Sequence, residues 1–188
     1  MTTTEKFLHD VNFDEPTVFI FRGLPGSGKT TLAEKVWAKY LNISGRLDPY
    51  MVLFGGYKTA VVCSADNYYH LNSSDGSYQF DKNKTSEAHN YCLRTFIGRI
   101  SSGRNEPILV ANTNTAIREF AHYVKIAKAY GFRVVVVSLD IDTDTSYNRN
   151  IHSVPLETIE LMQDRYLDAK IDAYAKTEKI THRFLNAR

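Results

Sequence analysis

Short apolar runs alternate along the chain with longer segments in which apolar residues recur every three or four positions. The short runs are rich in β-branched residues and predict buried strands, whereas the longer periodic segments predict helices that pack on a sheet. The strands are predicted at residues 18–21, 60–65, 108–111 and 134–139. Because strands that alternate with helices form parallel sheets covered on both faces, we expect an α/β fold with its ligand crevice at the carboxyl ends of the strands.

The predicted helices lie between these strands and after the last of them. They are expected at residues 31 to about 40, 85–101, 117–127 and 156–169, with Gly131 at the position of a helix C-cap. Glycine, proline and polar residues in segments 41–60 and 71–84 are typical of turns and long connections. The last segment, 170–188, has a mixed composition that predicts no particular element.

A complete GxxxxGKT phosphate-binding motif follows the first predicted strand and consists of Gly23, Leu24, Pro25, Gly26, Ser27, Gly28, Lys29 and Thr30. The glycines let the backbone wrap around an anion, and successive N–H groups at the start of the following helix face the phosphates. Lys29 adds a positive charge, and the hydroxyl of Thr30 is a typical ligand of Mg²⁺. The motif therefore predicts that residues 23–31, Thr31 included, bind the phosphates of a nucleoside triphosphate.

Polar residues follow several of the predicted strands and are further site candidates. Asp66, Asn112, Asn114 and Asp140 all come at predicted carboxyl ends, which meet beside the phosphate loop in a parallel sheet. We expect Asp66 to accept a hydrogen bond, and then a proton, from an acceptor hydroxyl, and to lie near the Mg²⁺ bound by Thr30. A turn or helix-capping carboxylate is the alternative interpretation of Asp66.

The segment before the last predicted helix contributes Arg149 as a candidate for neutralising charge during phosphoryl transfer. A solvated surface arginine is the alternative. Asp140, which follows a run of valines, resembles a Walker B acid. Asp142 and Asp144 are predicted to be solvated in the loop or to cap the helix that leads to Tyr147.

The composition indicates the number of domains, the kind of partner and the compartment that we expect for this chain. With 188 residues and 43% hydrophobic content, the chain is expected to form one domain over residues 1–188, with a core at about 17–169. A net charge of +2 requires no polyanionic partner, and Cys63 and Cys92 in apolar segments favour a reducing compartment. No apolar run is long enough for a signal peptide or a membrane span, so we expect a cytoplasmic protein without membrane contact. The oligomeric state is left open.

Further motifs occur in a fixed order beyond the phosphate loop. They are Ser64-Ala65-Asp66-Asn67-Tyr68-Tyr69, Gly76-Ser77-Tyr78-Gln79-Phe80, Ala88-His89, Asn112-Thr113-Asn114-Thr115 and Arg149-Asn150-Ile151-His152-Ser153-Val154-Pro155. Together they resemble the polynucleotide-kinase-like P-loop kinases over about residues 19–168. The branch that is most similar also contains the kinase-like domains of ubiquitin-ligase-binding proteins and of the cyclic-nucleotide phosphodiesterase.

This resemblance implies a P-loop NTPase three-layer sandwich of the nucleoside-kinase type that uses ATP and Mg²⁺. It implies that Lys29 and Thr30 bind the triphosphate and the metal, that Asp66 is the general base and that Arg149 is the lid arginine. Two positions depart from the family pattern. Ala111 stands where the family often has an aspartate, and Tyr69 stands where polynucleotide kinases have an arginine that holds the substrate phosphate.

We therefore expect an ATP-dependent kinase that phosphorylates a hydroxyl, with the 5′-hydroxyl of a polynucleotide or a related nucleotide as the leading acceptor. Tyr68, Tyr69 and Tyr78 either stack on a base of such an acceptor or belong to the core. The departures at Ala111 and Tyr69 favour a first alternative, a nucleotide-binding module without catalysis. A kinase for a small non-nucleic metabolite is the second alternative.

Overall fold

The computed structural model describes residues 1–44, 62–73 and 77–187. A parallel sheet of five strands in the order β2-β3-β1-β4-β5 forms the centre of the molecule. The strands are β1 (Thr17–Arg22), β2 (Val62–Cys63), β3 (Ile108–Ala111), β4 (Arg133–Asp140) and β5 (Thr181–Asn186). The central position of β1 places the segment after it between the carboxyl ends of β3 and β4.

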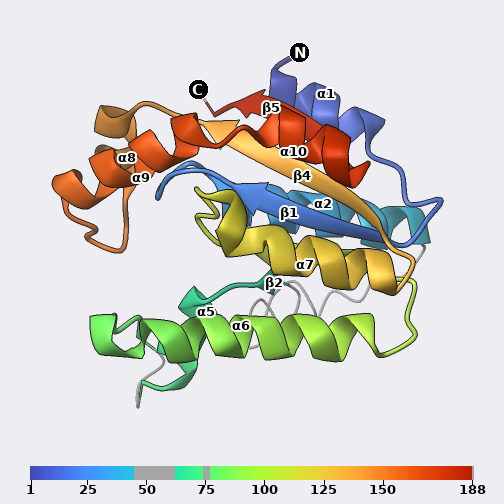
Figure 1. Ribbon diagram of the computed structural model, residues 1–188, viewed down its shortest axis with the longest axis horizontal. Helices are drawn as coiled ribbons and strands as arrows, with labels where there is room; N and C mark the ends of the chain where they lie inside the picture. The colour runs from blue at the N-terminus through green and yellow to red at the C-terminus, as the bar shows by residue number, and fades with distance from the viewer. Residues whose placement is uncertain (45–61, 74–76, 188) are drawn as a thin grey trace.

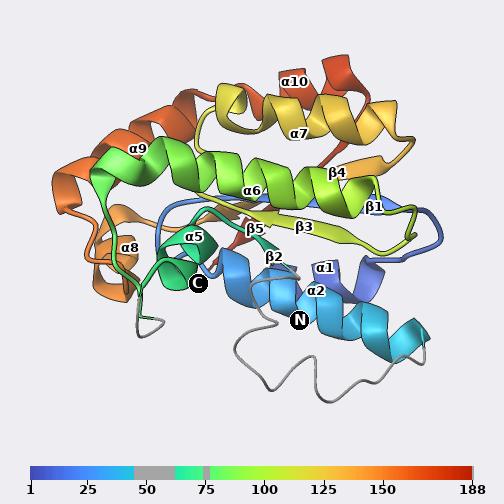
Figure 2. The ribbon, with the colours of Figure 1, turned by 90° about the horizontal axis from the view of Figure 1, so that it is seen from below.

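The helices form a layer on each face of the sheet (Figures 1 and 2). They are α1 (Thr3–Asp10), α2 (Lys29–Ser44), α5 (Asp66–Leu71), α6 (Thr85–Ile100), α7 (Ile117–Ala129), α8 (Thr143–Arg149), α9 (Leu156–Asp168) and α10 (Ile171–Glu178), with a 3-10 turn, η1, at Lys82–Lys84. In Figure 2 the sheet lies between α6, α7 and α10 on one side and α1 and α2 on the other. The α/β architecture predicted from the sequence is confirmed.

Burial on both faces explains why the strands appear as continuous apolar runs. Every residue of β1 is buried. Phe19 and Phe21 pack against α1 and α2, whereas Val18 and Ile20 pack against α6 and α7. A strand covered on both faces has no polar side, so its sequence shows no alternation of apolar and polar residues.

The helices α6 and α7 follow the predicted periodicity. Ala88, Cys92, Phe96 and Ile100 form the buried stripe of α6. After α7, the N–H of Gly131 donates to Lys128 O at 3.0 Å, and its φ of +77° lies in the region that glycine adopts most easily. The predicted stripe is therefore confirmed, and Gly131 lies one residue after the C-cap residue of α7, Tyr130.

Within the described residues, β2 covers Val62–Cys63 and so ends two residues before the predicted end at residue 65, and Asp66 begins helix α5. The first residues of the predicted strand, and segment 45–58, lie outside the described residues. The pattern of the chain did not predict α1, α10 or β5. Strand β5 lies at the edge of the sheet with Leu185 as its one buried residue, so its sequence lacks an apolar run.

No helix in the described ranges is long and apolar enough to cross a membrane.

Candidate functional site

The phosphate loop connects the carboxyl end of β1 with the amino end of α2. The N–H of Gly23 donates to Thr113 O at 2.9 Å, which holds the loop against the segment that follows β3. The first hydrogen bond of α2 runs from Leu32 N–H to Gly28 O, so the amides of residues 29–31 precede the helical ladder. These amides and the helix dipole favour an anion at this position.

Close contacts explain why two positions of the loop require glycine. A Cβ atom at Gly23 would lie 2.6 Å from Leu139 O, and one at Gly26 would lie 2.9 Å from the Cβ of Arg149. Gly26 also has a φ of +69°, which strains any residue with a side chain. A Cβ atom at Gly28 would meet nothing within 4 Å, so this backbone is open to a ligand.

Lys29 is buried within the loop and is 8% exposed. Its Nζ donates to Leu24 O at 2.6 Å and to Ser27 Oγ at 3.3 Å. Burial lowers the pKa of Lys29 to about 8, and the nearby charge of Asp66 opposes this shift. Among the described residues, no carboxylate lies within 4 Å of this ammonium group, so a bound anion would relieve its desolvation.

Thr30 and Thr31 follow Lys29 in the first turn of α2, and both are exposed. Their amides and hydroxyls are therefore accessible to a ligand over the loop. The described residues contain no cluster of three or more His, Cys, Asp or Glu side chains that could hold a metal by themselves. The exposed hydroxyl of Thr30 is an oxygen donor of the kind that Mg²⁺ accepts together with substrate phosphates.

Asp66 is the first residue of α5, and its side chain is 45% exposed. The hydroxyl of Tyr78 donates to Asp66 Oδ1 at 3.2 Å, and His152 Nε2 lies 3.8 Å from Oδ2. Ala65, not Asp66, is the N-cap residue of α5, and the N–H of Asp66 donates to Ser64 Oγ at 3.2 Å. The capping role considered for Asp66 is therefore wrong.

Asn112 and Asn114 support the backbone of the site. Asn112 Oδ1 accepts a hydrogen bond of 2.8 Å from the N–H of Ala65, which fixes the residue before Asp66. Asn114 has a φ of +48°, and its Nδ2 donates to Phe21 O at 2.8 Å. Both side chains thus bond to protein backbone at the carboxyl ends of the strands.

Arg149 is the last residue of α8, which packs against the phosphate loop. Ser146 Oγ donates to Pro25 O at 2.8 Å, and the Arg149 backbone and Cβ lie against Gly26. The exposed guanidinium donates from Nη1 to Ala187 O at 3.1 Å. The backbone of Arg149 therefore lies beside the phosphate loop, while its guanidinium contacts the segment after β5, and its role in charge neutralisation stays a prediction.

The acidic residues before α8 have separate roles. Asp142 is the N-cap of α8, and its carboxylate accepts hydrogen bonds of 2.8 Å from Thr145 N and Thr145 Oγ1. Asp144 is exposed in the first turn of the helix. Asp140 ends β4, and its backbone O accepts a hydrogen bond of 2.9 Å from Ala187 N. The predicted cap at Asp142 is confirmed, and the resemblance of Asp140 to a Walker B acid stays a prediction.

Arg22, a residue that sequence reasoning missed, is buried below the phosphate loop. Its guanidinium donates to the carbonyls of Asn114, Thr115 and Tyr166 and to Ser138 Oγ, over 2.9–3.2 Å. It also lies 4.0 Å from the centre of the Tyr166 ring. A charged residue at the end of an apolar strand, directly before a glycine loop, was the signal in the sequence.

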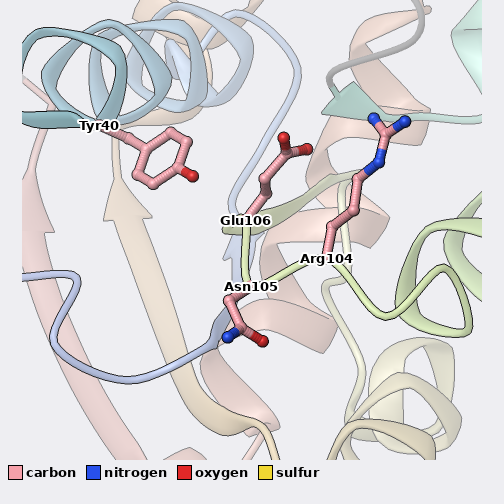
Figure 3. A pocket seen from close by; sticks show the side chains of 4 residues that line it. All are labelled: Tyr40, Arg104, Asn105 and Glu106. Atoms are coloured by element: carbon pink, nitrogen blue, oxygen red, sulfur yellow. The ribbon is translucent and has the colours of Figure 1, made fainter. Parts of the chain in front are cut away.

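A cavity of about 390 Å³ lies elsewhere, and Tyr40, Arg104, Asn105 and Glu106 line it (Figure 3). Residues 104–106 precede β3, so the cavity is at the amino end of the strands, whereas the phosphate loop is at their carboxyl end. We do not assign this cavity to the candidate site.

The parallel sheet, the flanking helix layers and the glycine loop define an α/β protein with the P-loop, kinase-like nucleotide-binding fold. Residues 18–167 match the family model described as AAA domain (AAA_33), so the chain belongs to that family. Human NEDD4-binding protein 2 is 32% identical over 155 residues, which cover 78% of this chain and 7% of that protein. This match confirms the kinase-like branch that the sequence motifs indicated.

YLP motif-containing protein 1 is a second relative. The human protein is 27% identical over 155 residues, covering 81% of this chain and 7% of its own length. The mouse protein is 27% identical over 156 residues, covering 81% of this chain and 11% of its own length. The chain thus spans only a small part of these relatives.

Solved structures share the fold. The AvrRxo1-ORF1:AvrRxo1-ORF2 complex with sulphate ions gives a TM-score of 0.64 at 18% identity, covering 98% of this chain and 58% of that chain. The same complex has also been solved with ATP, again with a TM-score of 0.64 and 18% identity. A structure from the PezAT toxin-antitoxin system of Streptococcus pneumoniae gives a TM-score of 0.58 at 14% identity, covering 98% and 75% of the two chains.

Proposed function

We propose that this protein is an ATP- and Mg²⁺-dependent kinase that transfers the terminal phosphate of ATP to a hydroxyl group. The observation that carries the proposal is the buried ammonium group of Lys29 in an open glycine loop, close enough to Asp66 for the two charges to interact. A cationic phosphate site that faces a carboxylate is the arrangement that phosphoryl transfer to a hydroxyl requires.

On the phosphate side, the amides of residues 29–31 and the ammonium group of Lys29 hold the triphosphate. Thr30, with Asp66 nearby, is the proposed ligand of Mg²⁺, which when bound neutralises part of the phosphate charge. One structural neighbour of the same fold has been solved with ATP, and this supports ATP as the nucleotide.

On the acceptor side, Asp66 accepts the proton of the acceptor hydroxyl. The acceptor oxygen forms a bond to the terminal phosphorus, and the bond from that phosphorus to the bridging oxygen breaks, so ADP leaves. Arg149 exchanges its contact with Ala187 O for the transferring phosphoryl group and stabilises the developing charge.

A polynucleotide 5′-hydroxyl, or a related nucleotide, is the acceptor that we propose. An aromatic cluster beside Asp66 supports it. Tyr78, which bonds to Asp66, packs against Tyr69 at 5.6 Å, and the exposed Phe80 packs against Tyr69 at 5.3 Å and offers a ring face to a base. Tyr69 itself is buried, and its hydroxyl donates to Asp81 O at 3.2 Å. It cannot replace the arginine that holds the substrate phosphate in polynucleotide kinases, so the acceptor has to be tested directly.

We also propose that residues 1–188 form one domain that acts in the cytoplasm. Contacts between α1 and β5 support a single domain, since both elements lie outside the matched range 18–167. Cys63 and Cys92 are buried free thiols, which supports a reducing compartment.

ATP labelled on its terminal phosphate tests the activity against 5′-hydroxyl oligonucleotides, nucleosides and a pool of small metabolites. We expect label on the oligonucleotides or nucleosides with the wild type and none with Lys29→Ala. Label on a metabolite alone selects a metabolite kinase. ATP binding without transfer to any acceptor selects the non-catalytic nucleotide-binding module.

A further inference from the structure

Two aromatic side chains from distant segments hold the carboxylate of Asp66. Tyr78 donates its hydroxyl to Oδ1 at 3.2 Å, and His152 Nε2 lies 3.8 Å from Oδ2. The Tyr78 and His152 rings pack on each other with their centres 4.0 Å apart and their planes tilted by 38°. These three side chains are called the Asp66 cluster below.

His152 belongs to a folded turn rather than to a loose connection. Its N–H donates to Asn150 Oδ1 at 3.1 Å, and Asn150 Nδ2 donates to Val154 O at 2.9 Å. This turn begins directly after Arg149, at the end of α8. Because α8 bonds to the phosphate loop through Ser146, the turn connects the phosphate side of the site with Asp66.

The protonation of the two rings in the Asp66 cluster favours donation to the carboxylate. Burial and the charge of Asp66 raise the pKa of Tyr78, so its hydroxyl keeps its proton. Burial lowers the pKa of His152, and His70 and Lys29 lower it further, while Asp66 raises it. His152 Nδ1 is buried and has no hydrogen-bond partner among the described residues, so a neutral ring carries its proton on Nε2, facing Asp66.

We propose that Tyr78 and His152 are positioning residues that fix the carboxylate of Asp66 for the acceptor hydroxyl and couple it to the segment that carries Arg149. This inference rests on the proposed function for the role of Asp66. Tyr78 occupies Oδ1, whereas the distance from His152 to Oδ2 exceeds that of a hydrogen bond. Oδ2 therefore remains available to the hydroxyl of the acceptor.

Kinetics test the positioning role. We expect Tyr78→Phe to lower kcat about tenfold, because its hydrogen bond to the charged carboxylate is lost. His152→Ala should lower kcat by a similar factor, because it removes the ring that packs on Tyr78 and lies beside Oδ2. The KM for ATP should stay unchanged in both variants, since no ATP contact is removed. His152→Gln, which keeps an N–H donor near the Nε2 position, should remain within about threefold of wild type. Exposed residues far from the site give the controls, Tyr130→Phe and His9→Gln.

A titration followed by NMR tests the contact without any need for catalysis. The His152 resonance is assigned by its loss in His152→Gln. Because Asp66 raises the pKa of His152, we expect Asp66→Asn to lower the pKa of His152.

The two experiments separate a failure of this inference from a failure of the proposed function. Wild-type kcat in both Tyr78→Phe and His152→Ala overturns the inference, and so does an unchanged pKa of His152 in Asp66→Asn. If the pKa falls as expected but no acceptor is phosphorylated, the contact stands, and the proposed function is the part that fails.

Discussion

At the scale of single residues, the phosphate loop contains features that a ligand-free protein does not need. Lys29 is charged at neutral pH although it is buried, and its contacts are neutral oxygens of Leu24 and Ser27. Gly26 adopts a conformation that other residues avoid. Such features reduce stability and are typical of sites built for a ligand.

The first prediction concerns Lys29 and pH. Its pKa falls from 10.5 in the unfolded chain to about 8 in the fold, so the unfolded state binds more protons between these values, and stability rises with pH. Between about pH 7 and 9.5, the free energy of unfolding of the wild type should rise by about 2 kcal/mol relative to Lys29→Met. Urea denaturation at both pH values measures this difference. Parallel pH profiles of the two proteins would contradict the burial of the charge.

The second prediction concerns Gly26→Ala. The added Cβ would lie 2.9 Å from the Arg149 Cβ at a φ of +69°, so we expect a loss of about 1–3 kcal/mol in stability and weaker ATP binding. Gly98→Ala is the matched control, since its Cβ meets nothing and alanine favours the helix interior. Denaturation and ATP titration of both variants make the comparison, and equal stability of the two would argue against the close packing.

At the scale of elements, the sequence predicted those helices and strands whose own apolar residues form a continuous run or a helical stripe. Strands β1, β3 and β4 could be predicted because they are continuous buried apolar runs. Helices α6 and α7 could be predicted because their buried residues recur at the helical period. Strand β5 and helix α1 could not, since β5 is an edge strand and α1 buries only Phe7. Their structure depends on contacts between the two ends of the chain, such as the bond from Asn186 N to Thr3 Oγ1 at 3.1 Å.

The third prediction concerns helix α8, which places Arg149 beside the phosphate loop. Asp142→Ala removes the N-cap and should lower stability by about 1 kcal/mol and slow phosphoryl transfer. Asp144→Ala, in the first turn of the same helix, should cost less than half as much, because it is exposed and is not the cap. Thermal denaturation and a transfer assay measure both effects. Equal losses in the two variants would mean that the cap does not organise this helix.

At the scale of the whole molecule, the strand order brings the site together. Because β1 lies between β3 and β4, the loop after β1 meets Thr113, which follows β3, and Leu139 of β4. The sequence motifs predicted this meeting, since each follows a strand. They did not predict that Tyr78 and His152 contact Asp66, because both come from connections whose path depends on tertiary packing.

The central claim is that Lys29 binds the phosphates of ATP and that Asp66 accepts the proton of the acceptor hydroxyl. Calorimetric titration of ATP into Lys29→Ala and Asp66→Ala, with a transfer assay on the same preparations, tests it most directly. We expect Lys29→Ala to weaken ATP binding by about 10- to 100-fold and Asp66→Ala to change it less than about threefold, with transfer abolished in both. Wild-type ATP affinity in Lys29→Ala, or full turnover in Asp66→Ala, would contradict the account.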